Sequence, residues 1–249
     1  MSSIKRCSVK KIRIYQSGEF TEGMSVTLSE EAGQHVGVVL RMHVGEQLCL
    51  FNGTNQEFTS TITAINKKKV LVTIDSSAQV NRESPLHIHL AQAISKGERM
   101  EFVIQKAVEL GVNTITPLIS ERCVVKLDAA RIQKKVQQWQ AIAVAACEQS
   151  GRNVVPLIAQ PLSLEHYLNQ CKAFIKLILH PYQAQPLKSF KIEESIALLI
   201  GPEGGFSEEE VLQAQALHFQ PVSLGPRILR TETATITALS VLQALGGDL

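Results

Sequence analysis

Two segments near the C-terminus combine glycine, proline and charged residues in a pattern typical of ligand-binding loops: Ile200-Gly201-Pro202-Glu203-Gly204-Gly205-Phe206 and Leu224-Gly225-Pro226-Arg227-Ile228-Leu229. Each follows an apolar run that predicts a buried strand. Ligands of open parallel sheets bind outside the carboxyl ends of the strands, and Leu179-His180-Pro181 follows a third such run. The loops therefore predict one ligand site. The alternative interpretation is that their glycines only shape tight turns.

Other common sites have little support in the sequence. It contains no Gly-x-Gly-x-x-Gly and no Gly-Lys-Ser/Thr, so neither a dinucleotide fingerprint nor a phosphate loop is predicted, and Glu203 would repel a phosphate. His87 and His89 share one face of a predicted strand without a third ligand in view, so we expect no metal. The five cysteines form no Cys-x-x-Cys pair, which disfavours a zinc site or a disulfide framework and favours a reducing cytoplasm.

The overall charge excludes a protein that holds nucleic acid by its global electrostatic field. The formal net charge is +2 and the pI about 8.3, so an RNA site must be a local patch. One candidate is the basic run that ends at Arg13, for which the alternative is a solvated terminal tail. No apolar run approaches the roughly 18 residues of a membrane span, so we expect a soluble chain without a membrane partner.

The first third of the chain has the period-two alternation of short strands, at residues 26–28, 48–51, 58–62 and 70–74. With Asn52-Gly53 as a turn candidate, the pattern predicts a small antiparallel sheet or barrel. The exception is a short helix that we expect over residues 30–42. Polar residues 75–85 indicate a domain boundary, which we place between residues 80 and 81.

Beyond this boundary, strands and helices alternate, which predicts an α/β domain with a parallel sheet covered on both faces. Strands are expected at residues 86–93, 114–119, 174–179, 196–200 and 222–224, and helices at 98–110, 128–150 and 164–168. Ser207 and Glu210 have the spacing of a capping box that opens another helix. Thr231 is expected to cap a last helix, which Gly246 ends.

The two loop motifs, together with Arg230-Thr231-Glu232-Thr233-Ala234, closely resemble the bacterial RsmE family, whose members methylate N3 of a uridine in 16S ribosomal RNA. The resemblance extends over almost the whole chain through Ile104–Val112, Ser120–Cys123 and Glu148–Asn153. It implies a PUA-like β-barrel at residues 1–80 that engages RNA, and a SPOUT methyltransferase domain with a trefoil knot at residues 81–249. It also implies S-adenosylmethionine as cofactor, a homodimer, and the small ribosomal subunit as partner.

Individual residues can be assigned roles: the cofactor contacts follow from the resemblance, the residues at the uridine from the chemistry of the reaction, and the RNA contacts from positive charge. Arg230 would act at the reacting uridine, whose N3 must lose a proton before it can accept a methyl group. Glu203 would act as a base or bind the cofactor's ribose, and we favour the ribose. The expected RNA contacts are Lys10, Arg13, Arg41, Lys96, Arg122 and Arg152. The expected cofactor contacts, mostly through backbone groups, are Leu179, His180, Pro181, Ile200, Gly201, Pro202, Glu203, Gly204, Gly205, Leu224, Gly225, Arg227, Ile228 and Leu229.

Three alternatives remain open at this point. The protein could methylate another RNA position, because the residues that select the base cannot be recognised in the sequence. It could be a noncatalytic RNA-binding protein that uses its N-terminal barrel and needs neither Gly204-Gly205 nor Arg230. A nucleotide-dependent α/β oxidoreductase is disfavoured by the missing glycine fingerprint. For Arg230 itself, the alternative is a structural pairing with Glu232 or a carbonyl group.

Overall fold

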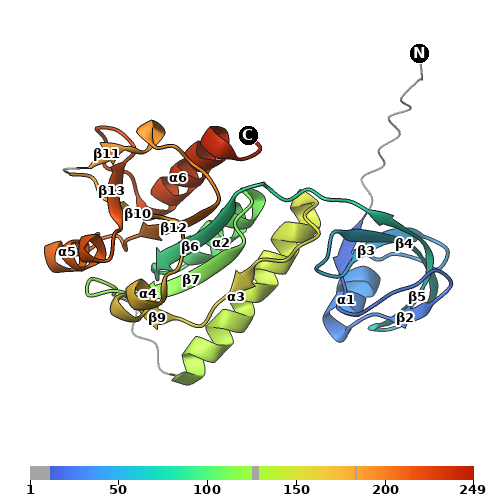
Figure 1. The fold of residues 1–249 in the computed structure, drawn as a ribbon. Helices are drawn as coiled ribbons and strands as arrows, with labels where there is room; N and C mark the ends of the chain where they lie inside the picture. The colour runs from blue at the N-terminus through green and yellow to red at the C-terminus, as the bar shows by residue number, and fades with distance from the viewer. Residues whose placement is uncertain (1–11, 125–128, 183) are drawn as a thin grey trace, which may run out of the picture. The chain divides into compact units, whose positions relative to one another are not determined.

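The computed structural model describes residues 12–124, 129–182 and 184–249 (Figure 1). Contacts divide the chain into two compact units. Unit 1 runs up to Glu83 and also contains Cys147–Val154, and unit 2 contains Ser84–Ala146 and Val155–Leu249. The main division, between Glu83 and Ser84, thus lies three residues beyond the boundary expected from the sequence. The segment Cys147–Val154 joins unit 1 because Arg152 and Asn153 form hydrogen bonds to residues of that unit.

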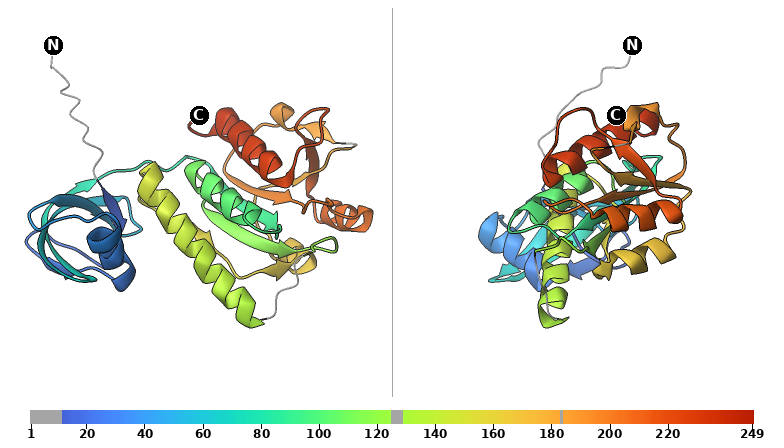
Figure 2. Two further views of the ribbon diagram at one scale, coloured as in Figure 1. Left: turned by 180° about the vertical axis from the view of Figure 1, so that it is seen from behind. Right: turned by 90° about the vertical axis from the view of Figure 1, so that its left-hand side faces the viewer.

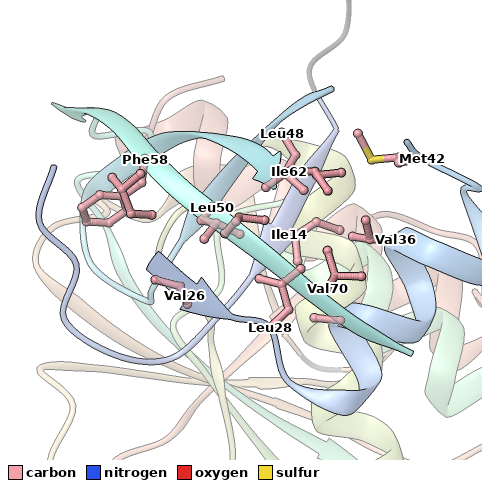
Figure 3. Packing of buried hydrophobic residues seen from close by; sticks show 13 residues of the cluster. Ile14, Val26, Leu28, Val36, Met42, Leu48, Leu50, Phe58, Ile62 and Val70 are labelled. Carbon is pink, nitrogen blue, oxygen red and sulfur yellow. The ribbon is translucent and has the colours of Figure 1, made fainter. Parts of the chain in front are cut away.

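Unit 1 is built on one five-stranded sheet in the order β1-β3-β4-β5-β2. Its strands are β1 (Arg13–Tyr15), β2 (Ser25–Thr27), β3 (Gln47–Phe51), β4 (Gln56–Asn66) and β5 (Lys69–Gln79). The β1 and β3 strands run parallel, and the other pairs are antiparallel. Alternate residues of β3, β4 and β5 point to one side and form the apolar core that Figure 3 shows, with Leu48, Leu50, Phe58, Ile62 and Val70 at its centre.

The helix expected over residues 30–42 differs from the structure. The α-helix α1 spans only Glu30–Gln34, and the chain continues as a π-helix, η1, over His35–Val39. The helix lies against the turn between β4 and β5. A Cβ on Gly33 would lie 2.1 Å from the Lys68 carbonyl oxygen, and one on Gly37 would lie 3.1 Å from that of Lys67. Glycines are therefore required where these two backbones meet.

Unit 2 contains a parallel sheet in the order β11-β13-β10-β12-β6-β7-β8, with β9 paired to β7. Both faces of a parallel sheet are normally buried, and the central strands accordingly consist of nearly continuous apolar residues. The strands are β6 (His87–Ala93), β7 (Thr114–Ile119), β8 (Leu157–Ile158), β9 (Leu162–Ser163), β10 (Ile175–Leu179), β11 (Gln185–Pro186), β12 (Ser195–Ile200) and β13 (Gln220–Ser223).

Helices cover both faces of this sheet, as the alternation of elements predicts. One face packs against α4 and α5 through a cluster that includes Leu168, Leu199, Phe206 and Phe219. On the opposite side, α2 and α6 pack against each other, as Figure 2 shows. The helices of this unit are α2 (Arg99–Glu109), α3 (Ala129–Ser150, in this unit up to Ala146), α4 (Leu164–Gln170), η2 (Leu187–Ser189), α5 (Glu208–Ala216) and α6 (Thr231–Gly246).

Candidate functional site

The three loops that the sequence singles out leave adjacent strands of the sheet. They follow β10, β12 and β13, which stand next to one another in the order β13-β10-β12. Their carboxyl ends therefore open at one edge, around a cavity of about 1030 Å³. Its lining contains all the residues expected at the cofactor: Leu179, His180, Pro181, Ile200, Gly201, Pro202, Glu203, Gly204, Gly205, Leu224, Gly225, Arg227, Ile228 and Leu229.

The loop after β12 is held in a tight turn by its own backbone. A Cβ on Gly201 would lie 3.1 Å from the carbonyl carbon of Gly205 and from the amide nitrogen of Phe206. Gly205 has φ +68° and donates its N–H to the Pro202 carbonyl at 2.9 Å. A Cβ on Gly204, by contrast, would make only an ordinary contact with Arg122 at 3.5 Å. Crowding by the loop's own backbone therefore disfavours a side chain at Gly201, whereas the positive φ of Gly205 favours glycine at that position.

The expected capping box closes this loop onto α5. Ser207 is the N-cap and accepts a hydrogen bond from the Glu210 N–H at 3.3 Å, while the Glu210 carboxylate accepts one from the Ser207 N–H at 2.9 Å. The same carboxylate accepts a bond from the Glu121 N–H at 2.8 Å. Glu210 thus joins the start of α5 to the loop after β7, and both segments border the cavity.

Glu203 is engaged at the rim of the cavity. Its Oε1 accepts hydrogen bonds from Arg99 Nη1 at 2.8 Å and from the Lys96 N–H at 3.2 Å. Partial burial opposes the charged form of Glu203, but the backbone N–H groups of Glu203 and Lys96 and the guanidinium of Arg99 outweigh it and lower its pKa. An ionised carboxylate with a lowered pKa is a poor general base and a good acceptor for hydroxyl groups.

Arg122, which we expected at the RNA, is exposed and also lines the cavity. Its Nη1 donates to the Gly204 carbonyl at 2.9 Å and to the Phe206 carbonyl at 3.4 Å. Arg99 also lines the cavity, although it is not among the cofactor contacts expected from the sequence. A usable signal was present: these arginines follow β6 and β7, whose carboxyl ends open at the same edge of the sheet as the glycine loops.

Arg230 lines the cavity at the start of α6. It is the N-cap residue, with φ −63° and ψ 154°, and Thr231 is the first residue of the helix, so the expected cap lies one residue too late. The Arg230 side chain is exposed, and within the described parts of the chain no hydrogen bond or ion pair to it is found. The alternative pairing with Glu232 is therefore not observed. An exposed guanidinium that lines the cavity is available to a bound ligand.

The other residues expected at RNA lie in different environments. Lys10 is outside the described residues. Arg41, with φ +53°, and Lys96 are both exposed. Arg13 and Arg152 have side chains that are only 12% and 5% exposed and pair with Glu57 and Glu83, respectively. These last guanidinium groups hold unit 1 together and offer RNA little accessible charge.

Glu57 is the centre of this charged cluster. It accepts bonds from Arg13 and Arg82, while Asn153 Oδ1 accepts a second Arg13 bond at 2.5 Å. Burial raises the pKa of Glu57, but its bonds to Arg82 and Arg13 and the charges of both arginines outweigh this and lower the pKa below 4.5. A lowered folded-state pKa stabilises unit 1 above about pH 4.5, and this contribution is lost as pH falls through the lowered value.

We therefore expect Glu57→Gln to reduce the unfolding free energy of unit 1 by about 1–2 kcal/mol at pH 7 and by less at pH 3, since only the ionised carboxylate attracts both arginines. Urea unfolding at the two pH values measures this difference. Glu19→Gln is the matched control, because Glu19 is an exposed carboxylate of the same unit. An equal loss at both pH values would contradict the electrostatic explanation.

The described residues show neither a metal cluster nor a membrane helix. No group of three or more His, Cys, Asp and Glu side chains in them could hold a metal ion. His89 bonds to Thr116 Oγ1 through Nε2 at 2.7 Å, and burial together with the neighbouring His87 lowers its pKa to about 4. None of the helices described is long and apolar enough to cross a bilayer.

Comparisons with known proteins agree with this architecture. Residues 82–243 match the model of an RNA methyltransferase domain, and residues 28–75 that of an RNA methyltransferase PUA domain. The chain is 39% identical to ribosomal RNA small subunit methyltransferase E of Buchnera aphidicola from Acyrthosiphon pisum, over 96% of both chains. It is 32% identical to the Bacillus subtilis protein of the same name, over 92% of this chain and 95% of that one.

Solved structures extend the agreement to three dimensions. A Legionella pneumophila structure with bound cofactor SAM has a TM-score of 0.95 and 59% identity, over 97% of this chain and all of that one. Ribosomal RNA small subunit methyltransferase E of Neisseria gonorrhoeae, bound to S-adenosyl methionine, has a TM-score of 0.90 and 39% identity, over 96% and 99% of the chains. In sequence, a PUA domain precedes an RNA methyltransferase domain, and the similarity to the named relatives covers nearly the full length of the chain. The chain therefore belongs to the ribosomal RNA small subunit methyltransferase E family.

Proposed function

We propose that this protein transfers the methyl group of S-adenosylmethionine to N3 of a uridine in 16S ribosomal RNA. The observation that carries the proposal is the convergence of three loops on one cavity in a member of this family. Relatives and solved neighbours named for the methylation of small-subunit RNA and bound to this cofactor support the same reaction.

The cavity fits the cofactor in size and in chemistry. Its volume of about 1030 Å³ suffices for a nucleoside joined to an amino acid, a ligand of the size that pockets of this class take. Gly201, Gly204 and Gly205 bring backbone amides and carbonyls to the surface without side chains, and Glu203 offers a carboxylate for hydroxyl groups. When bound, S-adenosylmethionine supplies the methyl group. We assign Glu203 to its ribose, since the lowered pKa argues against a base.

The electrostatics of the cavity suit an anionic substrate. Four arginines line it, namely Arg99, Arg122, Arg227 and Arg230, and only Arg99 is paired with a carboxylate among the contacts of the described residues. When uridine loses its N3 proton, negative charge spreads onto the two neighbouring carbonyl oxygens. We assign Arg230 to these oxygens, because a guanidinium that donates parallel hydrogen bonds stabilises such an anion.

The finer context of the reaction belongs to the same proposal. We infer a homodimer in the cytoplasm that acts on the small ribosomal subunit, with the barrel of unit 1 engaging RNA and a trefoil knot formed by residues 196–242. The match to an RNA methyltransferase PUA domain supports the RNA contact of unit 1, and relatives named for the small-subunit RNA support the ribosomal target. The dimer, the cytoplasm and the knot are what the resemblance to the family implies. Arg41, Lys96 and Arg122 are the exposed basic residues that we retain for RNA contacts. A monomer in sedimentation under assay conditions would contradict the dimer.

The decisive experiment incubates the protein with labelled S-adenosylmethionine and small ribosomal subunits that lack the modification. Nuclease digestion and mass spectrometry then locate the product. A single N3-methyluridine in 16S RNA is expected. A methyl group at another position would replace the target of the reaction but keep its class. RNA binding without methyl transfer to any RNA would favour the noncatalytic RNA-binding alternative. Reduction or oxidation of a bound nucleotide would favour the oxidoreductase alternative.

A further inference from the structure

A chain of buried polar side chains runs from the sheet to α6 at the wall of the cavity, which Thr231 itself lines. Gln92, on β6, is fully buried and stands beside Ile200 in the register of β6 and β12. Its Nε2 donates to the Thr231 hydroxyl at 3.1 Å, and the Thr231 hydroxyl donates to the Gly201 carbonyl at 2.8 Å. Gln92 Oε1 accepts from the Thr235 hydroxyl at 2.7 Å. Three elements that are far apart in sequence thus meet in one network.

The directions of the hydrogen bonds fix the orientation of the Gln92 amide and of the Thr231 hydroxyl. The carbonyls of Gly201 and Ala93 can only accept, so the Thr231 hydroxyl must donate to Gly201 and the amide of Gln92 must turn its Nε2 toward Ala93, at 3.1 Å. Its two N–H groups then serve Ala93 and Thr231. The Gln92 oxygen and the Thr231 carbonyl share the single proton of the Thr235 hydroxyl, at 2.7 and 2.8 Å. A connected buried network of this kind favours one geometry over alternatives.

This network acts on the two loops that carry the proposed chemistry. Gly201 opens the glycine loop that we assign to the cofactor, and Thr231 follows Arg230 directly. The hydroxyl of Thr231 therefore fixes the distance between the first residue of one loop and the last residue of the other. A shift of either loop would break a buried hydrogen bond, which costs more than an exposed one because water cannot replace it.

We infer that Gln92 and Thr231 are positioning residues, which couple the cofactor loop at Gly201 to the Arg230 junction through the chain Gln92–Thr231–Gly201. The inference rests on the proposed function only for its kinetic readout, since cofactor affinity can be measured without RNA. Neither residue is assigned a contact with reacting atoms. Their role is to hold the backbone that makes those contacts.

The test compares two replacements of Thr231 by calorimetric titration with S-adenosylmethionine. Valine has the shape of threonine without the hydroxyl, whereas serine retains the hydroxyl. We expect Thr231→Val to weaken cofactor binding about tenfold and Thr231→Ser to stay within about twofold. Thr237→Val is the matched control on the same helix, because among the described residues the Thr237 hydroxyl bonds only to the Thr233 carbonyl, at 2.7 Å. It should bind the cofactor like the unmodified protein.

A second variant tests the inference independently, in case Thr231→Val does not fold. Gln92→Met retains the length of the side chain but removes its amide, and we expect cofactor binding to weaken about threefold. In kinetics, both variants should raise KM for the cofactor while KM for RNA stays constant, a split that a general loss of stability would not produce. Unchanged affinity in folded Thr231→Val, or equal losses in Thr231→Val and Thr231→Ser, would overturn the inference. If no RNA is methylated, the titrations still decide it.

Discussion

Arg230→Ala is expected to lower kcat for methyl transfer about 100- to 1000-fold while the dissociation constant for S-adenosylmethionine stays within about twofold. The side chain lines the cavity, and no partner among the described residues holds it. Its guanidinium is therefore available to the uridine, which is neutral as the bound substrate and carries negative charge on its carbonyl oxygens in the transition state. Removing such a group affects the chemical step more than binding. Single-turnover kinetics with saturating cofactor measures the effect.

Two further variants separate position from charge. Arg230→Lys retains the positive charge but loses the paired donors, so we expect it to recover only part of the rate. Lys188→Ala removes one exposed cation of the same unit, at η2, and should leave kcat unchanged. If Arg230→Ala instead raised KM for RNA at constant kcat, Arg230 would be an RNA-binding residue without a role at the reacting base.

Local patterns in the sequence were sufficient to predict most of the regular elements. Residues 98–110 were expected as a helix, and α2 spans Arg99–Glu109, because its apolar residues recur at helical spacing and Gly111 ends it with φ +81°. The helix expected over residues 128–150 is α3 (Ala129–Ser150), followed by Gly151 at φ +89°. In both cases the signal lies within a few neighbouring residues.

Elements that depend on distant partners were missed. The three-residue strand β1 exists because Arg13, Ile14 and Tyr15 pair with Cys49, Leu50 and Phe51, and no local pattern encodes that pairing. The same holds for the two-residue strands β8, β9 and β11. The π-helix η1 replaces an expected α-helix where Gly33 and Gly37 lie against the β4–β5 turn. Long-range packing decides each of these cases.

The candidate site shows the same division between local and distant information. The glycine loops are contiguous motifs, so the sequence identified them and the structure places them around one cavity. Arg13 and Arg152 looked like RNA contacts by charge alone. Their partners are 44 and 69 residues away in sequence, at Glu57 and Glu83. The role of Gln92 could not be predicted from the sequence, because it depends on hydrogen bonds to Thr231 and Thr235, which are distant in sequence.

Phe219→Ala is expected to destabilise unit 2 by about 3–5 kcal/mol, the usual cost of the cavity that remains when a buried phenylalanine is truncated. Phe219 is 1% exposed and packs in the cluster that joins α4 and α5 to the sheet. Its ring also lies 5.6 Å from Lys176 Nζ, whose ammonium donates to the Leu217 carbonyl at 3.3 Å. The residue therefore supports the turn between α5 and β13, and with it the strand that ends at the cavity.

Thermal unfolding followed by calorimetry measures the effect, and the transition of unit 2 should fall by about 10 °C. Phe174→Ala is the matched control, because the Phe174 side chain is 72% exposed and its truncation should change stability by less than about 0.5 kcal/mol. Cofactor at about 100 times its dissociation constant should stabilise the control variant by about 2.7 kcal/mol, since it binds only the folded unit. A shift below about 3 °C for Phe219→Ala would mean that the core around α5 repacks, and the loop after β13 would then not depend on this ring for its position.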